Sequence, residues 1–207
     1  MNIVFDFGAV LFTWQPGQLL MQTFPQQVDT TEKAAHLAHQ VFGHPDWHNF
    51  DRGVLGLDEV IARTSERLDL PLPEMRKLVQ GIGERLMPIQ DTVALLRQLR
   101  ARRLEGRGIT GLYYLSNMPE SYARVLEERH DFLQWFDGGI FSGDVKVIKP
   151  DPVIYQLLQS RYALEPANTL FIDDLKSNVN VALALGWQGI HFESPHQLQA
   201  ALALSGL

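Results

Sequence analysis

Polar side chains stand at the ends of four short apolar runs in this sequence. They are Asp6 at the end of 3–7, Ser116 after 112–115, Lys149 beyond 139–141, and the pair Asp173 and Asp174 after 169–172. Carboxylate oxygens are hard ligands that suit Mg²⁺, which usually also binds phosphate oxygens of a substrate. Lysine and serine hold phosphoryl oxygens by charge and hydrogen bonds, and an aspartate can attack phosphorus to form an aspartyl-phosphate. Together these residue types predict a site shared by a divalent cation and a phosphoryl group.

Each of these residues, taken alone, has an ordinary structural explanation. An aspartate such as Asp6 near a glycine at a strand end is often a turn residue, and Ser116 has the form of a helix cap. Adjacent carboxylates such as Asp173 and Asp174 are harder to explain, because they repel each other unless a cation compensates them. The ordered combination of all four features, each at a strand end, favours a functional site over coincidence.

An alternation of strands and helices positions these residues. The apolar runs at 3–7, 112–115, 139–141, 169–172 and 189–192 predict buried strands, with helical patterns between the later ones. Such alternation predicts right-handed crossovers and a doubly wound, Rossmann-like α/β fold, with a parallel sheet covered on both faces. Ligands bind beyond the carboxyl ends of the strands in sheets of this kind. The polar residues are therefore expected at one rim.

Residues 14–87 show helical patterns only. Their apolar residues repeat at helical spacing in three stretches, which predicts a small helical bundle inserted after the first strand. We expect 1–13 with 88–207 to form the α/β core domain and 14–87 to form a helical cap domain. Candidates for contact with a substrate in or near this insertion are Trp14, Trp47, His48, Phe50, Asp51 and Arg52.

Three side chains predict where helices begin. Asp29 with Glu32 has the spacing of a capping box, Ser177 is expected to cap a helix that Gly186 ends, and Ser194 before a proline is expected to open the last helix.

Composition excludes several classes of function. The 207 residues carry a formal charge of −6 with 45% hydrophobic and 20% charged residues, the mixture of a soluble globular protein. The absence of cysteine excludes disulfides, thiolate metal sites and a cysteine nucleophile. A sequence pI of about 5.6 argues against nucleic acid as a partner, and no apolar run is long enough for a membrane. Neither the basic start nor the apolar stretch of a signal peptide is seen, so we expect a cytoplasmic enzyme.

Four motifs in order resemble those of the haloacid dehalogenase superfamily. They are Asp6-Phe7-Gly8-Ala9-Val10, Leu115-Ser116-Asn117, Lys149-Pro150-Asp151-Pro152, and Phe171-Ile172-Asp173-Asp174 with Asn178. The resemblance covers essentially the whole chain, and the insertion is similar to the cap of type-one members. The first motif resembles that of small phosphatases such as α-D-glucose-1-phosphate phosphatase and the N-terminal domain of soluble epoxide hydrolases.

The resemblance implies a role for each matching residue. Asp6 would be the nucleophile and a metal ligand, with the Gly8 carbonyl and Asp174 as further ligands of Mg²⁺ and Asp173 in or beside the metal site. Lys149 and Ser116 would hold the phosphoryl group and Asn117 would shape its pocket. The implied activity is Mg²⁺-dependent hydrolysis of a small phosphorylated metabolite.

Two positions depart from the family's pattern. Phosphatases of the superfamily usually carry a second aspartate as general acid/base where this chain has Gly8. Such a group contributes about 10²–10⁴-fold, most with poor leaving groups. A sugar 1-phosphate leaves as a hemiacetal and needs less protonation, which makes a sugar phosphate a plausible substrate class. The second departure is Lys146, where relatives generally have glycine, and which adds charge at the rim.

Two alternatives remain open at the level of the sequence. In a 2-haloacid dehalogenase the same aspartate displaces halide from carbon without a metal, although the carboxylates of Asp173 and Asp174 would repel its carboxylate substrate. In the other alternative, motivated by Gly8, the protein is a phosphate-binding regulatory module with little turnover. Neither the metabolite nor the oligomeric state is encoded in a readable pattern.

Overall fold

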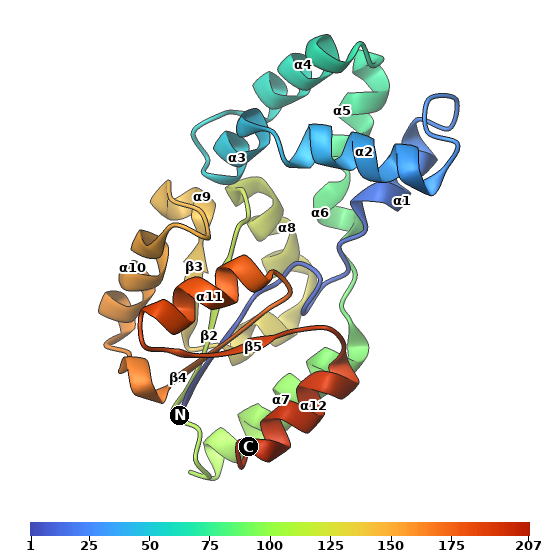
Figure 1. The fold of residues 1–207 in the computed structure, drawn as a ribbon. Helices are drawn as coiled ribbons and strands as arrows, with labels where there is room; N and C mark the ends of the chain where they lie inside the picture. Colours follow the sequence, from blue (N-terminus) through green and yellow to red (C-terminus); the bar gives the residue numbers. More distant parts are fainter.

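A five-stranded parallel sheet forms the centre of the protein in the computed structural model, which describes residues 1–207 (Figure 1). Its strands, in the order β3-β2-β1-β4-β5, are β1 Asn2–Phe5, β2 Gly111–Ser116, β3 Gly138–Phe141, β4 Thr169–Asp173 and β5 Gln188–His191. Val4 of β1 pairs with Tyr113 of β2 on one side and with Phe171 of β4 on the other. The predicted doubly wound sheet is therefore confirmed, and the carboxyl ends of β1, β2 and β4 are neighbours.

Helices cover both faces of this sheet. They are α7 Gln90–Leu104, α8 Glu120–Arg129, α9 Ser142–Val145, α10 Pro152–Tyr162, α11 Lys176–Ala184 and α12 Pro195–Leu204, with short 3-10 turns η1 Asp131–Trp135 and η2 Pro166–Asn168. None of the helices combines the length and apolar character required to cross a membrane.

The central strand sends alternate side chains into two separate cores. Ile3 and Phe5 pack in the larger core, to which helices α7, α8 and α12 contribute. Val4 points the opposite way, into a smaller core with Tyr155 of α10 and Ala182 of α11. Successive side chains of a strand point to opposite faces, so a strand covered on both sides must be apolar throughout. This requirement explains the uninterrupted apolar run before Asp6.

Six helices lie between β1 and α7 in the sequence. They are α1 Pro16–Thr23, α2 Thr31–Phe42, α3 Pro45–Asp51, α4 Leu57–Leu68, α5 Leu72–Gln80 and α6 Ile82–Arg85. Figure 1 shows them beyond the carboxyl ends of the strands, where α6 approaches α8. The two connecting segments run side by side, because Thr13 N–H donates to the Met87 carbonyl and Ile89 N–H donates to the Leu11 carbonyl.

The three predicted helix starts have different outcomes. Ser194 caps α12 as expected, since its hydroxyl accepts from the N–H of Gln197. The cap of α2 is Thr30, one residue after the predicted Asp29, whose carboxylate instead pairs with Lys33. The prediction for Ser177 is wrong, because Leu175 stands at the start of α11.

The early start of α11 follows from the strand before it. Asp173 Oδ1 accepts the N–H of Leu175 at 2.8 Å, so the end of β4 turns the chain directly into the helix. The same carboxylate thus belongs to the fold and to the predicted site.

Candidate active site

Three carboxylates meet where β1 and β4 end. Asp6 directly follows β1, Asp173 is the last residue of β4, and Asp174 comes next. One oxygen from each lies within 4.8 Å of the others. Strand pairing brings Phe5 beside Ile172, so side chains more than 160 positions apart in sequence share one rim. The fold therefore assembles a compact group of oxygen ligands.

Lys149 lies against this group. Its Nζ is 2.8 Å from Asp6 Oδ1 and 2.6 Å from Asp173 Oδ2, and only 1% of its side chain is exposed. The main chain of Lys149 is held in turn by Asn117, whose Oδ1 accepts the lysine N–H at 2.7 Å and whose Nδ2 donates to the lysine carbonyl at 2.9 Å. Burial and this clamp fix the ammonium beside Asp6.

The two adjacent aspartates differ in their surroundings. Asp173 is fully buried, and its oxygens accept hydrogen bonds from Lys149 Nζ, from Nδ2 of Asn178 and from the N–H of Leu175. Asp174 is partly exposed and lines the cavity described below. Asp173 is thus engaged in orienting Lys149 and Asn178, whereas Asp174 is open to an incoming ligand.

The electrostatics of the group call for a further positive charge. Burial raises the pKa of Asp6 to about 7, since the repulsion of Asp173 and Asp174 adds to it and Lys149 only partly opposes it. Burial and Asp173 likewise raise the pKa of Asp174 to about 6. Burial would lower the pKa of Lys149, but Asp173 and Asp6 outweigh that effect and raise it. When all three carboxylates are ionised, the single ammonium leaves two negative charges uncompensated.

These residues fit Mg²⁺. A divalent cation matches the uncompensated charge, and the oxygen donors are those that Mg²⁺ prefers. Asp6 and Asp174, which face the cavity, would hold the ion together with the carbonyl of Gly8, while Asp173 would support them through Lys149. The metal roles of Asp6, Gly8, Asp173 and Asp174 stay predictions.

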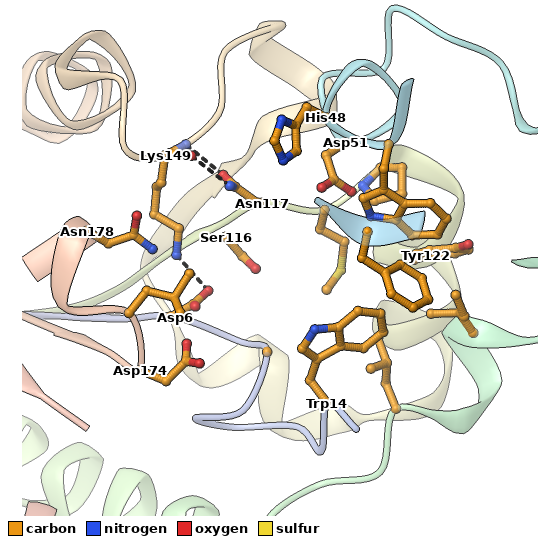
Figure 2. Close-up of a pocket in the computed structure, with 18 residues that line it drawn as sticks. Asp6, Trp14, His48, Asp51, Ser116, Asn117, Tyr122, Lys149, Asp174 and Asn178 are labelled. Atoms are coloured by element: carbon orange, nitrogen blue, oxygen red, sulfur yellow. Dashed lines mark hydrogen bonds and ion pairs between the residues drawn. The ribbon is translucent and has the colours of Figure 1, made fainter. Parts of the chain in front are cut away.

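A cavity of about 270 Å³ opens over the carboxylates. The predicted phosphate-binding residues Ser116, Asn117 and Lys149 lie on its wall with Asp6 and Asp174 (Figure 2). The opposite wall is largely apolar and is formed by Trp14, Phe42, Trp47, Ile82, Leu86, Met118 and Tyr122. One end of the cavity thus offers charge and hydrogen bonds, and the other offers apolar surface.

Aromatic rings connect the two parts of the chain across this cavity. Trp14 packs edge-to-face on Phe42, Phe42 on Trp47, Trp47 on Phe50 and Phe50 on Tyr122, with ring centroids 4.6–5.5 Å apart. Such pairs stabilise by about 0.5–1.5 kcal/mol each beyond their burial. The chain of rings therefore fixes the apolar wall from the loop after β1 to α8.

Four of the candidate contacts in or near the insertion reach the cavity, and the first of them is Trp14, between β1 and α1. Trp47, His48 and Asp51, all on α3, line it, and Figure 2 shows His48 and Asp51 across from Asp6. Phe50 packs behind the wall, and Arg52 does not line the cavity but donates to Oδ1 of Asn49.

Nothing in the sequence indicated that several other residues of the cavity wall would lie at the site. Ile82 and Leu86 were apparent only as apolar residues of a helix, and Met118 and Tyr122 lie just after Ser116 and Asn117. Proximity to that motif is the one signal that singles out Met118.

Two core residues bind the main chain of the insertion. Ser142 Oγ donates to the carbonyl of Asp51 at 2.6 Å, and Lys146 Nζ donates to the carbonyl of Gly53 at 2.9 Å. The sequence suggested that Lys146 adds charge at the rim of the site. In the structure its ammonium instead binds main-chain carbonyl groups, a structural contact that the sequence did not reveal. Together these bonds hold the end of α3 over the cavity.

Known proteins resemble the chain along most of its length. The model of the family described as haloacid dehalogenase-like hydrolase matches residues 3–186. A sesquiterpene phosphatase of Aspergillus oryzae is 29% identical over 188 residues, which cover 91% of this chain and 87% of that protein.

Solved structures share the fold at lower identity. A haloacid dehalogenase family enzyme of Bacteroides thetaiotaomicron, in complex with magnesium and inorganic phosphate, superposes with a TM-score of 0.70 at 18% identity over 93% of both chains. An L-2-haloacid dehalogenase of Xanthobacter autotrophicus gives a TM-score of 0.62 at 22% identity over 91% of this chain and 75% of its own.

Proposed function

The chain belongs to the haloacid dehalogenase-like hydrolases, and on that premise we propose that it is a Mg²⁺-dependent phosphatase of a small phosphorylated metabolite. The main observation in support is the group formed by Asp6, Asp173 and Asp174 with Lys149, which when fully ionised has two uncompensated negative charges that a divalent cation would balance. Phosphatases among its relatives support the same reaction.

In the proposed reaction Asp6 Oδ attacks phosphorus and forms an aspartyl-phosphate, which water then hydrolyses. Lys149 neutralises part of the charge on the phosphoryl oxygens, Ser116 donates a hydrogen bond to them, and Asn117 keeps Lys149 in place. When bound, Mg²⁺ supplies further charge that stabilises the transition state. Asp173 holds the lysine through its ion pair.

The apolar wall constrains the leaving group. We propose that residues 14–87 act as a cap that covers the substrate and excludes water from the reacting phosphate. Trp14, Trp47 and Tyr122 offer ring surface, and the Tyr122 hydroxyl is already donated to the carbonyl of Val79. A leaving group with an apolar face fits this wall better than one that needs many hydrogen bonds. A sugar phosphate remains a candidate, because ring faces of sugars are apolar.

Hydrolysis of p-nitrophenyl phosphate, with Mg²⁺ and with EDTA, tests the proposal. We expect turnover by the native protein with Mg²⁺, none with EDTA, and none by Asp6→Asn. Asp46→Asn is the matched control, because Asp46 is a cap carboxylate that pairs with Arg63 and does not line the cavity. No turnover with this activated ester would remove the phosphatase assignment. A panel of sugar phosphates and apolar alkyl phosphates then ranks the leaving groups.

The 2-haloacid dehalogenase reaction is the second candidate, favoured by the shared fold. Its expected signature is chloride release from 2-chloropropionate that survives EDTA. The unpaired charge beside Asp6 weighs against it, since a carboxylate substrate would meet two uncompensated negative charges. The regulatory alternative would appear as stabilisation by Mg²⁺ and phosphate without turnover.

A further inference from the structure

The attack of Asp6 leaves one chemical need unmet. When the bond between phosphorus and the ester oxygen breaks, its electron pair goes to that oxygen, and an alkoxide is a poor leaving group without a proton. Gly8 has no side chain to give one. A Cβ built there would come no closer than 3.9 Å to Trp14 Cβ, so the position has space for a side chain that this sequence does not provide.

Most groups on the cavity wall are unsuited to give this proton. Lys149 is engaged by Asp6 and Asp173, and the Tyr122 hydroxyl is donated to a main-chain carbonyl. Burial together with Arg52 and His44 lowers the pKa of His48, which disfavours the protonated imidazole that would donate a proton.

Asp51 differs from these groups. It lines the cavity, and its carboxyl group forms no hydrogen bond or ion pair with the protein. Figure 2 shows it pointing into the cavity from the cap side, opposite the end that holds Asp6. Its main chain is fixed, since Ser142 Oγ of the core donates to its carbonyl at 2.6 Å. Asp51 is therefore a free carboxyl group on an anchored backbone.

We propose that Asp51 is the general acid that protonates the leaving group, an inference that rests on the proposed phosphatase activity. As Asp6 Oδ bonds to phosphorus, the ester oxygen departs with the electron pair and takes the proton of Asp51, and the alcohol leaves. The Asp51 carboxylate then accepts a proton from water as that water attacks phosphorus. The bond from phosphorus to Asp6 breaks with its electron pair returning to Asp6, so phosphate leaves and Asp51 is protonated again.

The surroundings of Asp51 suit this role. Burial holds the pKa of Asp51 well above the usual range, and Arg52, the next residue in the chain, only partly opposes that effect. The other titratable groups near it are His48 on α3, Tyr122 on α8 and Lys146 after α9, whose ammonium is bound to main-chain carbonyls. A carboxylic acid in this position therefore keeps its proton where an exposed aspartate would lose it.

The test compares leaving groups of different basicity. kcat/KM for p-nitrophenyl phosphate, whose leaving group needs no proton, and for phenyl and alkyl phosphates is measured with Mg²⁺ for the native protein, Asp51→Asn and the control Asp46→Asn. We expect Asp51→Asn to lose about 10²–10⁴-fold on the alkyl ester and no more than a few-fold on the p-nitrophenyl ester. For the native protein, kcat/KM on the alkyl ester should also decrease as pH rises and Asp51 loses its proton. Asp51→Asn should not show this decrease.

A second variant guards against a purely structural effect. Adding Gly8→Asp to Asp51→Asn places a new carboxyl group in the wall of the same cavity, and we expect part of the alkyl-ester rate to return. An equal fall on both esters, or no fall on either, would overturn the role of Asp51. Failure of the native protein on p-nitrophenyl phosphate would instead reject the phosphatase activity itself, so the two failures are distinguishable.

Discussion

The side chain of Asn117 forms two hydrogen bonds with the main chain of Lys149, one to its N–H at 2.7 Å and one to its carbonyl at 2.9 Å. Asn117 follows β2 and Lys149 lies beyond α9, so the amide joins two segments 32 residues apart. A buried ammonium with a long, flexible side chain needs such an anchor at its base. The pair thus explains why an asparagine next to Ser116 affects a lysine at the other side of the site.

Replacing Asn117 by alanine is therefore expected to act through Lys149. Loss of two hydrogen bonds should lower the free energy of unfolding by about 1–3 kcal/mol. kcat/KM on an aryl phosphate should fall roughly 10- to 100-fold, as for other residues that orient a functional side chain. Urea unfolding and steady-state kinetics measure the two effects. Asn2→Ala, at the far end of β1, should keep full activity.

Lys149→Met should expose how strongly the carboxylates depend on the ammonium. Removing one partner of a buried ion pair costs about 3–5 kcal/mol, because the remaining charges stay buried without compensation. We expect a loss of this size in urea unfolding at pH 7 and a smaller loss at pH 5, where Asp6 and Asp174 hold their protons. The exposed pair of Lys33 with Asp29 provides the control, and Lys33→Met should be far less destabilising because solvent screens that pair. Equal losses in the two variants would contradict this account.

The sequence was sufficient for the sheet and for the residues at its rim. Successive side chains of a strand point to opposite faces of the sheet, so a strand buried on both faces must be apolar at every position. These apolar runs end at Asp6, Ser116 and Asp173. Because parallel strands put all their carboxyl ends at one edge, the spacing along the chain translates directly into proximity in space. The proximity of Asp6, Ser116 and Asp173 can therefore be predicted from their positions at the ends of parallel strands.

The cavity wall and the local helix starts were less predictable. Trp14, Phe42 and Tyr122 line the same cavity only because of how the insertion packs over the core, and no periodic pattern in the sequence records that packing. The start of α11 depends on Asp173, which accepts an N–H bond two residues later, and this bond overrides the capping tendency of Ser177. Sequence patterns over a few residues predict neither contacts between distant segments nor which of two neighbouring side chains caps a helix.

Lys146 offers a test of how the cap is held. The residue has φ 62°, in the left-handed region, and its Nζ binds the carbonyls of Gly53 and Gly143. Lys146→Ala removes the bonds and keeps the strain, whereas Lys146→Gly removes both. We expect amide hydrogens of 53–55 to exchange faster in both variants and Lys146→Gly to be more stable than Lys146→Ala by about 1 kcal/mol. Unchanged exchange in both variants would show that the lysine does not hold the cap.

The stability of the metal-free protein should depend on pH because two carboxyl groups of the site have raised pKa values. Asp6 and Asp174 have pKa values of about 7 and about 6 in the folded chain, above the usual value of 3.8. Because the folded chain binds these protons more tightly than the unfolded chain, its free energy of unfolding without metal should fall as pH rises from about 4 to about 7.

The metal should reverse that loss. Mg²⁺ binds the ionised carboxylates and must displace their protons, so its affinity rises over the same pH range. The increase in Tm caused by Mg²⁺ in large excess over the protein is expected to be small at pH 5 and larger at pH 8. Asp174→Asn, which removes one cavity-facing ligand, should reduce the increase at pH 8, whereas Asp58→Asn on the exposed face of α4 should not. A Tm increase that is independent of pH would place the ion away from these carboxylates.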